Sequence, residues 1–331
     1  MQQRQLGPFQ VSAIGFGCMN VSSGYGPRPA DDVGGRLLNA ALDQGYTFLD
    51  TASLYGIGHN ETLIGEYLRS RRHEYTLASK CGFSRTEDGK TIMDGRPETI
   101  RQTCEDSLRR LQTDTIDLYY LHRIDPKVPV EETVGALAGL VEQGKIQTIG
   151  LSEISSDSLR RAHAVHPITA VQSEYSLWTR TPERKILATC AELGIAFVAF
   201  SPLARQFLTG KCGDVTSVLE DDIRATIARP RFEPENFARN RRLLTPYAAI
   251  AEHEGCSQAQ LALAWLLARG DNIIPIPGTK HHEWMVENAG AADIELSHET
   301  VAELDALINE DTVSGTRYTD ALMASTDSEK D

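Results

Sequence analysis

Four proton-donating or ionisable residues fall at or just beyond the ends of three apolar segments of this chain. Asp50 closes YTFLD, Tyr55 lies in the turn after it, Lys80 closes YTLASK and His122 closes TIDLYYLH. A free tyrosine has a pKa of about 10, too high for efficient proton donation at neutral pH, and a nearby ammonium lowers it. We therefore expect Lys80 to lower the pKa of Tyr55, and Asp50 to keep Lys80 charged.

A neutral His122 beside these groups can orient a carbonyl oxygen through a hydrogen bond. A phenol that protonates a carbonyl oxygen requires a second group to attack the carbonyl carbon. No segment of the chain looks like a protein nucleophile. Hydride transfer from a bound cofactor is therefore the expected chemistry.

Two other kinds of site use the same residue types. Lys80 at a strand end could form a Schiff base, as in barrel aldolases, but its pairing with Asp50 and Tyr55 argues against this. His163 and His166 stand three residues apart on a helix end without carboxylate or cysteine partners, so neither they nor His122 predict a metal site.

The candidate catalytic residues lie at the ends of short apolar segments, of which the chain has eight. Such segments are typical of strands covered on both faces, as in parallel sheets. Amphipathic segments with helical spacing separate them, and this alternation predicts a parallel β/α fold. The strand segments are 14–19, 46–50, 75–80, 115–122, 145–152, 168–173, 195–201 and 272–278, and the helical ones are 31–45, 60–72, 97–112, 130–144, 156–165 and 182–194.

Proline and glycine mark the helix boundaries. Pro97 and Pro182 stand where a first helical turn begins, and Gly45, Gly144 and Gly194 stand between a helical pattern and a strand, where a left-handed residue is expected. Eight β/α units within about 280 residues predict a (β/α)8 TIM barrel rather than an open doubly wound sheet.

The segments outside the repeats predict additions to a single barrel domain over residues 1–331. Residues 4–12 predict a β-hairpin across the barrel floor, and 204–232 predict a long functional loop after the seventh strand. Helical patterns follow at 244–253 and 258–268. The polar C-terminal tail, 312–331, is expected to be partly mobile, with Tyr318 and Met323 able to dock.

Composition narrows the class of protein. The chain has 331 residues, 41% hydrophobic and 24% charged, and a net charge of −13, which argues against nucleic acid or an anionic membrane as the main partner. No apolar run reaches the roughly 20 residues of a membrane span, and the first residues resemble no signal peptide. Six scattered cysteines indicate reduced thiols and a cytoplasmic protein. The sequence leaves the oligomeric state open.

The segments LDTASLYG, LASK and DLYYLH resemble the catalytic segments of the aldo-keto reductase superfamily. The similarity continues in the same order through IGLSE, VQSEYS, FVAFSPL, PIPGTK and VEN, over nearly the whole chain. Within the superfamily the chain is most similar to the branch that includes pyridoxal reductase-like and perakine reductase-like enzymes. The resemblance implies that Asp50, Tyr55, Lys80 and His122 are its catalytic tetrad.

The resemblance also implies a nicotinamide cofactor bound in an extended form, without a Rossmann fold. Ser152 and Gln172 match positions that hold the carboxamide, Phe200 the aromatic that stacks under the nicotinamide ring, and Ser201 and Leu203 contacts to the pyrophosphate. The segment GFGCMN agrees with this, because it lacks the third glycine of a GxGxxG site.

The segment PIPGTKHHEWMVEN resembles the family's site for the adenosine 2′-phosphate and adenine. Gly278, Thr279 and Lys280 fall on phosphate-binding positions, and Glu287 and Asn288 on adenine contacts. A turn at a helix start with a hydroxyl and a lysine is a sound anion site on its own. The resemblance therefore implies NADPH/NADP+ as the cofactor, with NADH less favoured.

Three positions depart from the family pattern. Glu153 stands where asparagine is often found, which questions its contact with the carboxamide. Trp284 stands where many relatives place a basic residue on the phosphate, which weakens the preference for NADPH. Gln206 stands where glycine is usual and is expected to narrow or stiffen the loop over the cofactor.

The predicted function is reduction of an aldehyde or ketone to the alcohol, or the reverse oxidation, with Tyr55 as proton donor. The alternative is a nucleotide-binding, redox-sensing subunit with slow turnover, like the channel-associated branch of the superfamily. The substrate depends on loops at 20–29, 83–95, 176–181 and 205–240 and on the C-terminal tail, and the sequence does not identify it. Tyr25 and Trp178 in these loops are either pocket residues or packing anchors.

Overall fold

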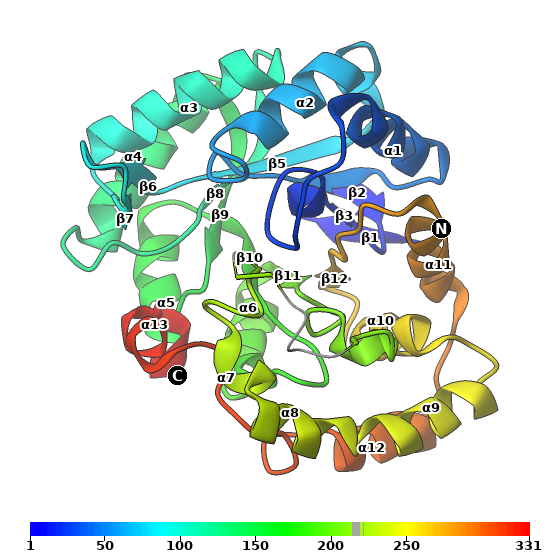
Figure 1. Cartoon of the computed structure of the whole chain (residues 1–331). Helices are drawn as coiled ribbons and strands as arrows, with labels where there is room; N and C mark the ends of the chain where they lie inside the picture. Colours follow the sequence, from blue (N-terminus) through cyan, green and yellow to red (C-terminus); the bar gives the residue numbers. More distant parts are fainter. Residues whose placement is uncertain (214–218, 221) are drawn as a thin grey trace.

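Eight short parallel strands surround the centre of the molecule in the computed structural model, which describes residues 1–213, 219–220 and 222–331 (Figure 1). Their order in the sheet is β12-β11-β10-β9-β8-β5-β4-β3. Each lies within one of the eight predicted segments or extends it by one residue. The strands are β3 (Phe16–Gly17), β4 (Phe48–Asp50), β5 (Thr76–Cys81), β8 (Ile116–Leu121), β9 (Ile146–Ser152), β10 (Ile168–Glu174), β11 (Ala196–Phe200) and β12 (Ile273–Pro275).

Backbone hydrogen bonds join the first and last strand segments. Gly15 N donates to Pro275 O at 2.9 Å, and Gly17 N donates to Pro277 O at 3.2 Å. A Cβ atom at residue 17 would lie 2.7 Å from the Ile276 carbonyl oxygen, so only glycine permits this approach. The predicted (β/α)8 barrel is confirmed, with this seam closing the ring.

Helices cover the outside of the barrel in the predicted alternation. Gly45, Gly144 and Gly194 all have φ between 67° and 92°, as the sequence predicts for residues that follow a helix. Pro97 is the first residue of its helix. The helices of the first six units are α1 (Asp31–Asp43), α2 (His59–Leu68), α3 (Pro97–Leu111), α4 (Val130–Glu142), α5 (Ser156–Val165) and α6 (Ile186–Leu193).

The predicted helix start at Pro182 is wrong for α6. Pro182 lies in a separate 3-10 turn (Thr181–Glu183), and α6 begins at Ile186. Lys185 separates the two with φ −150° and ψ −44°, a non-helical conformation. The proline therefore starts the short turn and not the helix.

The predicted hairpin closes the bottom of the barrel. It consists of β1 (Gln3–Leu6) and β2 (Phe9–Ser12), paired antiparallel. Leu6 and Val11 belong to the cluster that fills the barrel interior, together with Phe48 and Leu118. A second antiparallel hairpin, β6 (Phe83–Arg85) and β7 (Thr91–Met93), lies in the loop after β5 and was not predicted.

Extra helices follow β11. The helical patterns at 244–253 and 258–268 are confirmed as α9 (Leu244–His253) and α10 (Gln258–Ala268). The predicted loop ends early, because α7 (Arg229–Phe232) takes its last four residues and α8 (Pro234–Arg241) follows; residues 214–218 and 221 of that loop lie outside the described part. After β12 come α11 (His282–Gly290), α12 (His298–Leu307) and α13 (Asp320–Ser325).

The C-terminal tail packs beside α5, where Figure 1 shows α13 and the chain end. Ser155 N donates to the Asp327 carboxylate at 2.8 Å, and Ser156 N donates to Asp331 at 3.0 Å. Negative charge at a helix N-terminus is favourable, so these contacts fix the tail to α5. No helix of the described residues is long and apolar enough to cross a membrane.

Candidate active site

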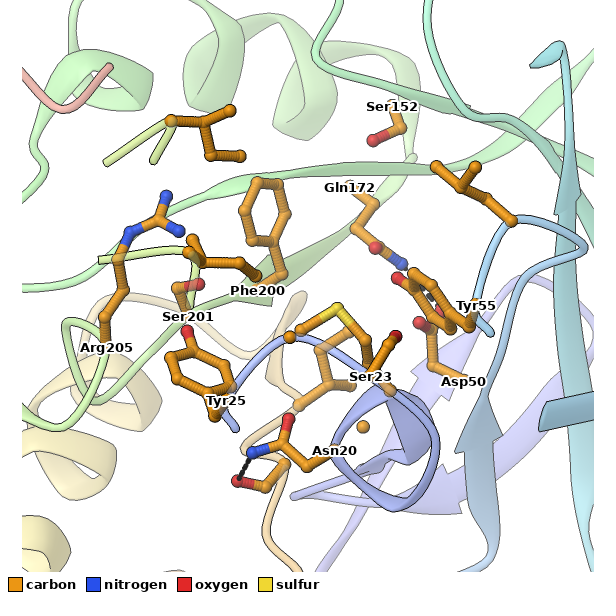
Figure 2. A pocket seen from close by; sticks show the side chains of 18 of the residues that line it. Asn20, Ser23, Tyr25, Asp50, Tyr55, Ser152, Gln172, Phe200, Ser201 and Arg205 are labelled. Atoms are coloured by element: carbon orange, nitrogen blue, oxygen red, sulfur yellow. Dashed lines mark hydrogen bonds between the residues drawn. The ribbon is translucent and has the colours of Figure 1, made fainter. Parts of the chain in front are cut away.

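A cavity of about 1060 Å3 opens at the C-terminal ends of the barrel strands. Figure 2 shows Asp50, Tyr55, Ser152 and Gln172 on one side of it and Tyr25, Ser201 and Arg205 on the other, with Phe200 between. Every predicted cofactor residue lines it, and so does every member of the predicted tetrad except Lys80. These lining residues are Asp50, Tyr55, His122, Ser152, Gln172, Phe200, Ser201, Leu203, Gly278, Thr279, Lys280, Glu287 and Asn288.

Lys80 lies directly beneath the cavity. Its side chain is fully buried, and Nζ donates to Asp50 Oδ1, to Thr51 O at 2.9 Å and to Tyr55 OH at 3.3 Å. The second carboxylate oxygen of Asp50 accepts a hydrogen bond from Gln172 Nε2 at 2.7 Å. The structure thus places the ends of β4, β5 and β10 in one hydrogen-bonded group with Tyr55.

The electrostatic balance keeps Lys80 charged. Burial lowers the pKa of Lys80, but the negative charge of Asp50, helped by Tyr55 and by hydrogen bonds to both, outweighs burial and leaves that pKa above its ordinary value. The expectation for the Asp50–Lys80 pair therefore agrees with the structure. The ammonium is held within hydrogen-bonding distance of the phenol.

The expected direction of the Tyr55 pKa is wrong. Burial raises the pKa of Tyr55, and although Lys80 lowers it, burial is the larger effect and the pKa stays above its ordinary value. The resting phenol is therefore protonated, which is the state that a proton donor requires. Lys80 remains in place to stabilise a phenolate as it forms.

His122 stands over the phenol as a neutral ring. Its ring centroid lies 5.9 Å from that of Tyr55 and 5.2 Å from that of Phe83, both in edge-on geometry. Burial, followed by the charges of Arg123 and Lys80, holds the pKa of His122 well below its ordinary value. Nδ1 is buried and has no hydrogen-bond partner among the described residues.

The backbone after β11 is strained where it enters the cavity. Ser201, Ala204, Arg205 and Gln206 all have φ between 49° and 79°, a region that costs non-glycine residues about 1–3 kcal/mol each. The Gln206 side chain accepts a hydrogen bond from Arg224 Nη1 at 2.8 Å. Gln206 thus keeps a conformation typical of glycine and adds a bond that anchors the loop.

The opposite end of the cavity contains the segment that was predicted to bind phosphate. A Cβ atom on Gly278 would lie 2.7 Å from Gly17 O and 2.8 Å from Asn20 Oδ1. Lys280 Nζ donates to Tyr25 O at 2.9 Å and to the carbonyl of residue 27 at 3.0 Å. The glycine lets the backbone pass close to the first strand segment, and the lysine ties the loop after that strand to the cavity.

Trp284 contacts one aromatic ring and one lysine. Its ring lies 4.1 Å from the His281 ring, and Lys211 Nζ lies 5.5 Å from its centroid. Lys211 also lies 3.4 Å from Glu287 Oε2. Lys211, from the loop after β11, therefore lies beside Trp284, which occupies the position where many relatives have a basic residue.

The structure distinguishes the roles of the two loop aromatic residues that the sequence left open between the pocket and packing. Trp178 is buried, stacks on Phe207 with ring centroids 4.2 Å apart and does not line the cavity, so it is a packing anchor. Tyr25 lines the cavity. Sequence reasoning missed Asn20 and Arg205, which also line it, because no strand pattern indicates where a loop side chain points.

The chain is similar to known proteins over nearly its whole length. Residues 13–309 match the model described as "Aldo/keto reductase family". A "Probable aldo-keto reductase 1" of Glycine max is 42% identical over 330 residues, covering 97% of this chain and 94% of that protein. The more specific resemblance to pyridoxal reductase-like and perakine reductase-like enzymes stays a prediction.

Solved structures of similar proteins have the same fold. A glycerol dehydrogenase from Gluconobacter oxydans superposes with a TM-score of 0.83 at 30% identity, covering 92% of this chain and 94% of that one. An aldo-keto reductase from Klebsiella pneumoniae, solved in complex with NADPH, gives a TM-score of 0.72 at 28% identity, covering 96% and 99%.

Proposed function

Because this chain belongs to the aldo/keto reductase family, we propose that it is an NADP-dependent oxidoreductase that reduces an aldehyde or ketone to the alcohol, with Tyr55 as the proton donor. The observation that carries the proposal is the contact of Lys80 Nζ with Tyr55 OH at 3.3 Å while Asp50 balances its charge. The similar Klebsiella pneumoniae protein was solved with NADPH. The family and the site chemistry therefore support the same reaction.

The residues present fit a dinucleotide. Ser152 and Gln172 offer a hydroxyl and an amide at the end of the cavity near Tyr55, while Thr279 and Lys280 offer a hydroxyl and a cation at the other end. NADPH, when bound, supplies the hydride that no residue of the chain can supply.

Residues of the chain donate the proton and stabilise the charge that its transfer leaves behind. His122 orients the carbonyl oxygen of the substrate, and the Tyr55 hydroxyl donates its proton to that oxygen. Lys80 stabilises the resulting phenolate, and Asp50 keeps the ammonium in position. The rings of Tyr55 and Phe83 pack against His122, and the low polarity of this burial strengthens these interactions.

The test is oxidation of NADPH, followed by its absorbance, with a panel of aldehydes. We expect turnover by the wild-type protein and a loss of kcat of about 10²- to 10⁴-fold in Tyr55→Phe. Tyr67→Phe, a change on α2 away from the cavity, is the matched control and should keep full activity. Tight NADPH binding without turnover above Tyr55→Phe would contradict the enzyme proposal and support the nucleotide-binding subunit instead.

A further inference from the structure

Arg123 stands at the rim of the cavity, immediately after His122 and the end of β8. It is partly buried, and its Nη1 donates to His122 O at 2.6 Å and to Ser152 Oγ at 3.2 Å. These two bonds hold the guanidinium plane between the ends of β8 and β9. The cation is therefore fixed beside the reacting residues.

The other edge of this guanidinium is unused. Within the described part of the chain, no group accepts a hydrogen bond from Nε or Nη2 of Arg123, and no carboxylate forms an ion pair with it. The edge formed by Nε and Nη2 presents two parallel N–H donors. That pair matches the two oxygens of a carboxylate.

The charged side chains around Arg123 have hydrogen-bond partners of their own. Asp50 offsets Lys80, and Arg317 pairs with Glu153, the acid that follows Ser152. Asp125 is buried, and its carboxylate accepts hydrogen bonds from Gly95 N at 3.1 Å and from the backbone N–H of residue 127 at 2.9 Å. In a protein of net charge −13, Arg123 thus brings to the active site a positive charge that no carboxylate of the described residues pairs with directly.

The nearby wall of the cavity is apolar. Side chains from the turn after β4, the β6–β7 hairpin and α13 contribute to it. They are Leu54, Phe83, Ile92, Met93 and Leu322. A ligand that satisfies this end of the cavity has an apolar body, a carbonyl beneath His122 and one anionic group within reach of Arg123.

We propose that Arg123 is a specificity-determining residue that binds the carboxylate of the substrate, so that the enzyme prefers aldehydes bearing a carboxylate over neutral aldehydes of the same shape. The proposal rests on the proposed reductase function and assigns a substrate class to that site. Lys127, which lines the same side of the cavity, adds positive charge to this end.

The test compares 4-carboxybenzaldehyde with 4-methylbenzaldehyde in the wild type, Arg123→Met and Arg123→Lys. Arg123→Met should lower kcat/KM for the carboxylated aldehyde by about 10- to 100-fold, mainly through KM, because a hydrogen bond to a charged group is lost. The loss on the methyl compound should be at least about 10-fold smaller, because that aldehyde loses only the support that Arg123 gives to His122 and Ser152, and Arg123→Lys should restore part of the preference. 4-Formylphenyl phosphate forms a third arm.

Equal losses for the carboxylated and methylated aldehydes would overturn the proposal, because they would mean that Arg123 acts only through His122 and Ser152. A stronger dependence on Arg123 for the phosphate ester would overturn the assignment to carboxylates. Calorimetry of 4-(hydroxymethyl)benzoate binding to the NADP+ complex separates the two proposals. Binding that Arg123→Met abolishes would support the carboxylate site even if the protein oxidised no NADPH.

Discussion

Glu153 and Arg317 form a buried ion pair that joins the end of β9 to the C-terminal tail. Arg317 Nη1 donates to Glu153 Oε1 at 3.0 Å across 164 residues of sequence, and Nη2 donates to the second carboxylate oxygen. Ser328 also donates to this carboxylate, and its backbone N–H donates to Glu153 O at 3.1 Å. Glu153 therefore faces the tail and not the cavity. Because Tyr318 and Leu322 line the cavity, this pair positions one of its walls.

Removing one partner of this pair should destabilise the protein. Arg317→Ala leaves a buried carboxylate without its main partner, and such a change typically costs about 3–5 kcal/mol of the free energy of unfolding. The double variant Glu153→Gln/Arg317→Met should be less destabilised than the sum of its two single variants. Urea denaturation measures both. Arg161→Ala, which breaks the exposed Arg161–Glu131 pair, is the control and should leave the midpoint nearly unchanged.

The same pair should make stability depend on pH in the acid range. Burial raises the pKa of Glu153, but Arg317 outweighs burial and lowers that pKa from 4.5 to about 2. A group whose pKa is lowered by folding contributes stability above its unfolded pKa and loses it as the pH falls through the folded pKa. Stability from Glu153 should therefore fall between about pH 4.5 and pH 2. Urea midpoints should fall less steeply across this window in Glu153→Gln, and an unchanged slope would contradict the role of the pair.

Asp50→Asn should shift the pH dependence of turnover. Asp50 is the main group that raises the pKa of Lys80 against the effect of burial, so without it burial lowers that pKa and Lys80 loses its proton more readily. We expect kcat at neutral pH to fall by about 100-fold or more and to recover in part as the pH is lowered, because acid restores the ammonium. The pH profile of kcat checks this, with Asp32→Asn on the surface of α1 as control. Activity that falls further on acidification would contradict it.

The sequence located the candidate tetrad because its members depend on a regular feature. In parallel β/α repeats the ends of successive strands share one face, so Asp50, Lys80 and His122 had to meet once the strands were assigned. The pKa of Tyr55 was wrongly predicted, because its direction depends on the degree of burial, which strand patterns do not give. The Glu153–Arg317 pair was not predicted, because a contact between residues 164 positions apart leaves no periodic pattern in the sequence.

The loops likewise contain features that the sequence predicts and features that it does not. The resemblance assigned the glycine at position 278 to the phosphate site, and no pattern indicated that its backbone passes close to Gly17 and Asn20. The sequence left Trp178 equally open to packing or to the pocket, because a loop aromatic serves either purpose until its neighbour, here Phe207, is known.

The preference for NADPH should depend on Lys280 and should increase when Trp284 is made basic. Lys280 Nζ lines the anion end of the cavity, so Lys280→Met should weaken NADPH binding by about 10-fold or more and NADH binding much less, since NADH lacks the 2′-phosphate. Trp284→Arg should tighten NADPH binding by adding a second cation beside Lys211.

Quenching of protein fluorescence on titration with each nucleotide measures the dissociation constants of NADPH and NADH for the wild type and both variants, and NADH serves as the internal reference for changes in folding. That reference is needed because Lys280 also donates to Tyr25 O, so its loss loosens the loop as well as the anion site. Lys185→Met, on an exposed lysine before α6, is the charge-matched control and should alter neither constant. Equal affinity of the wild type for NADPH and NADH would contradict the assignment of Lys280 to the 2′-phosphate. An equal loss for both nucleotides in Lys280→Met would instead mean that the lysine acts by holding the loop.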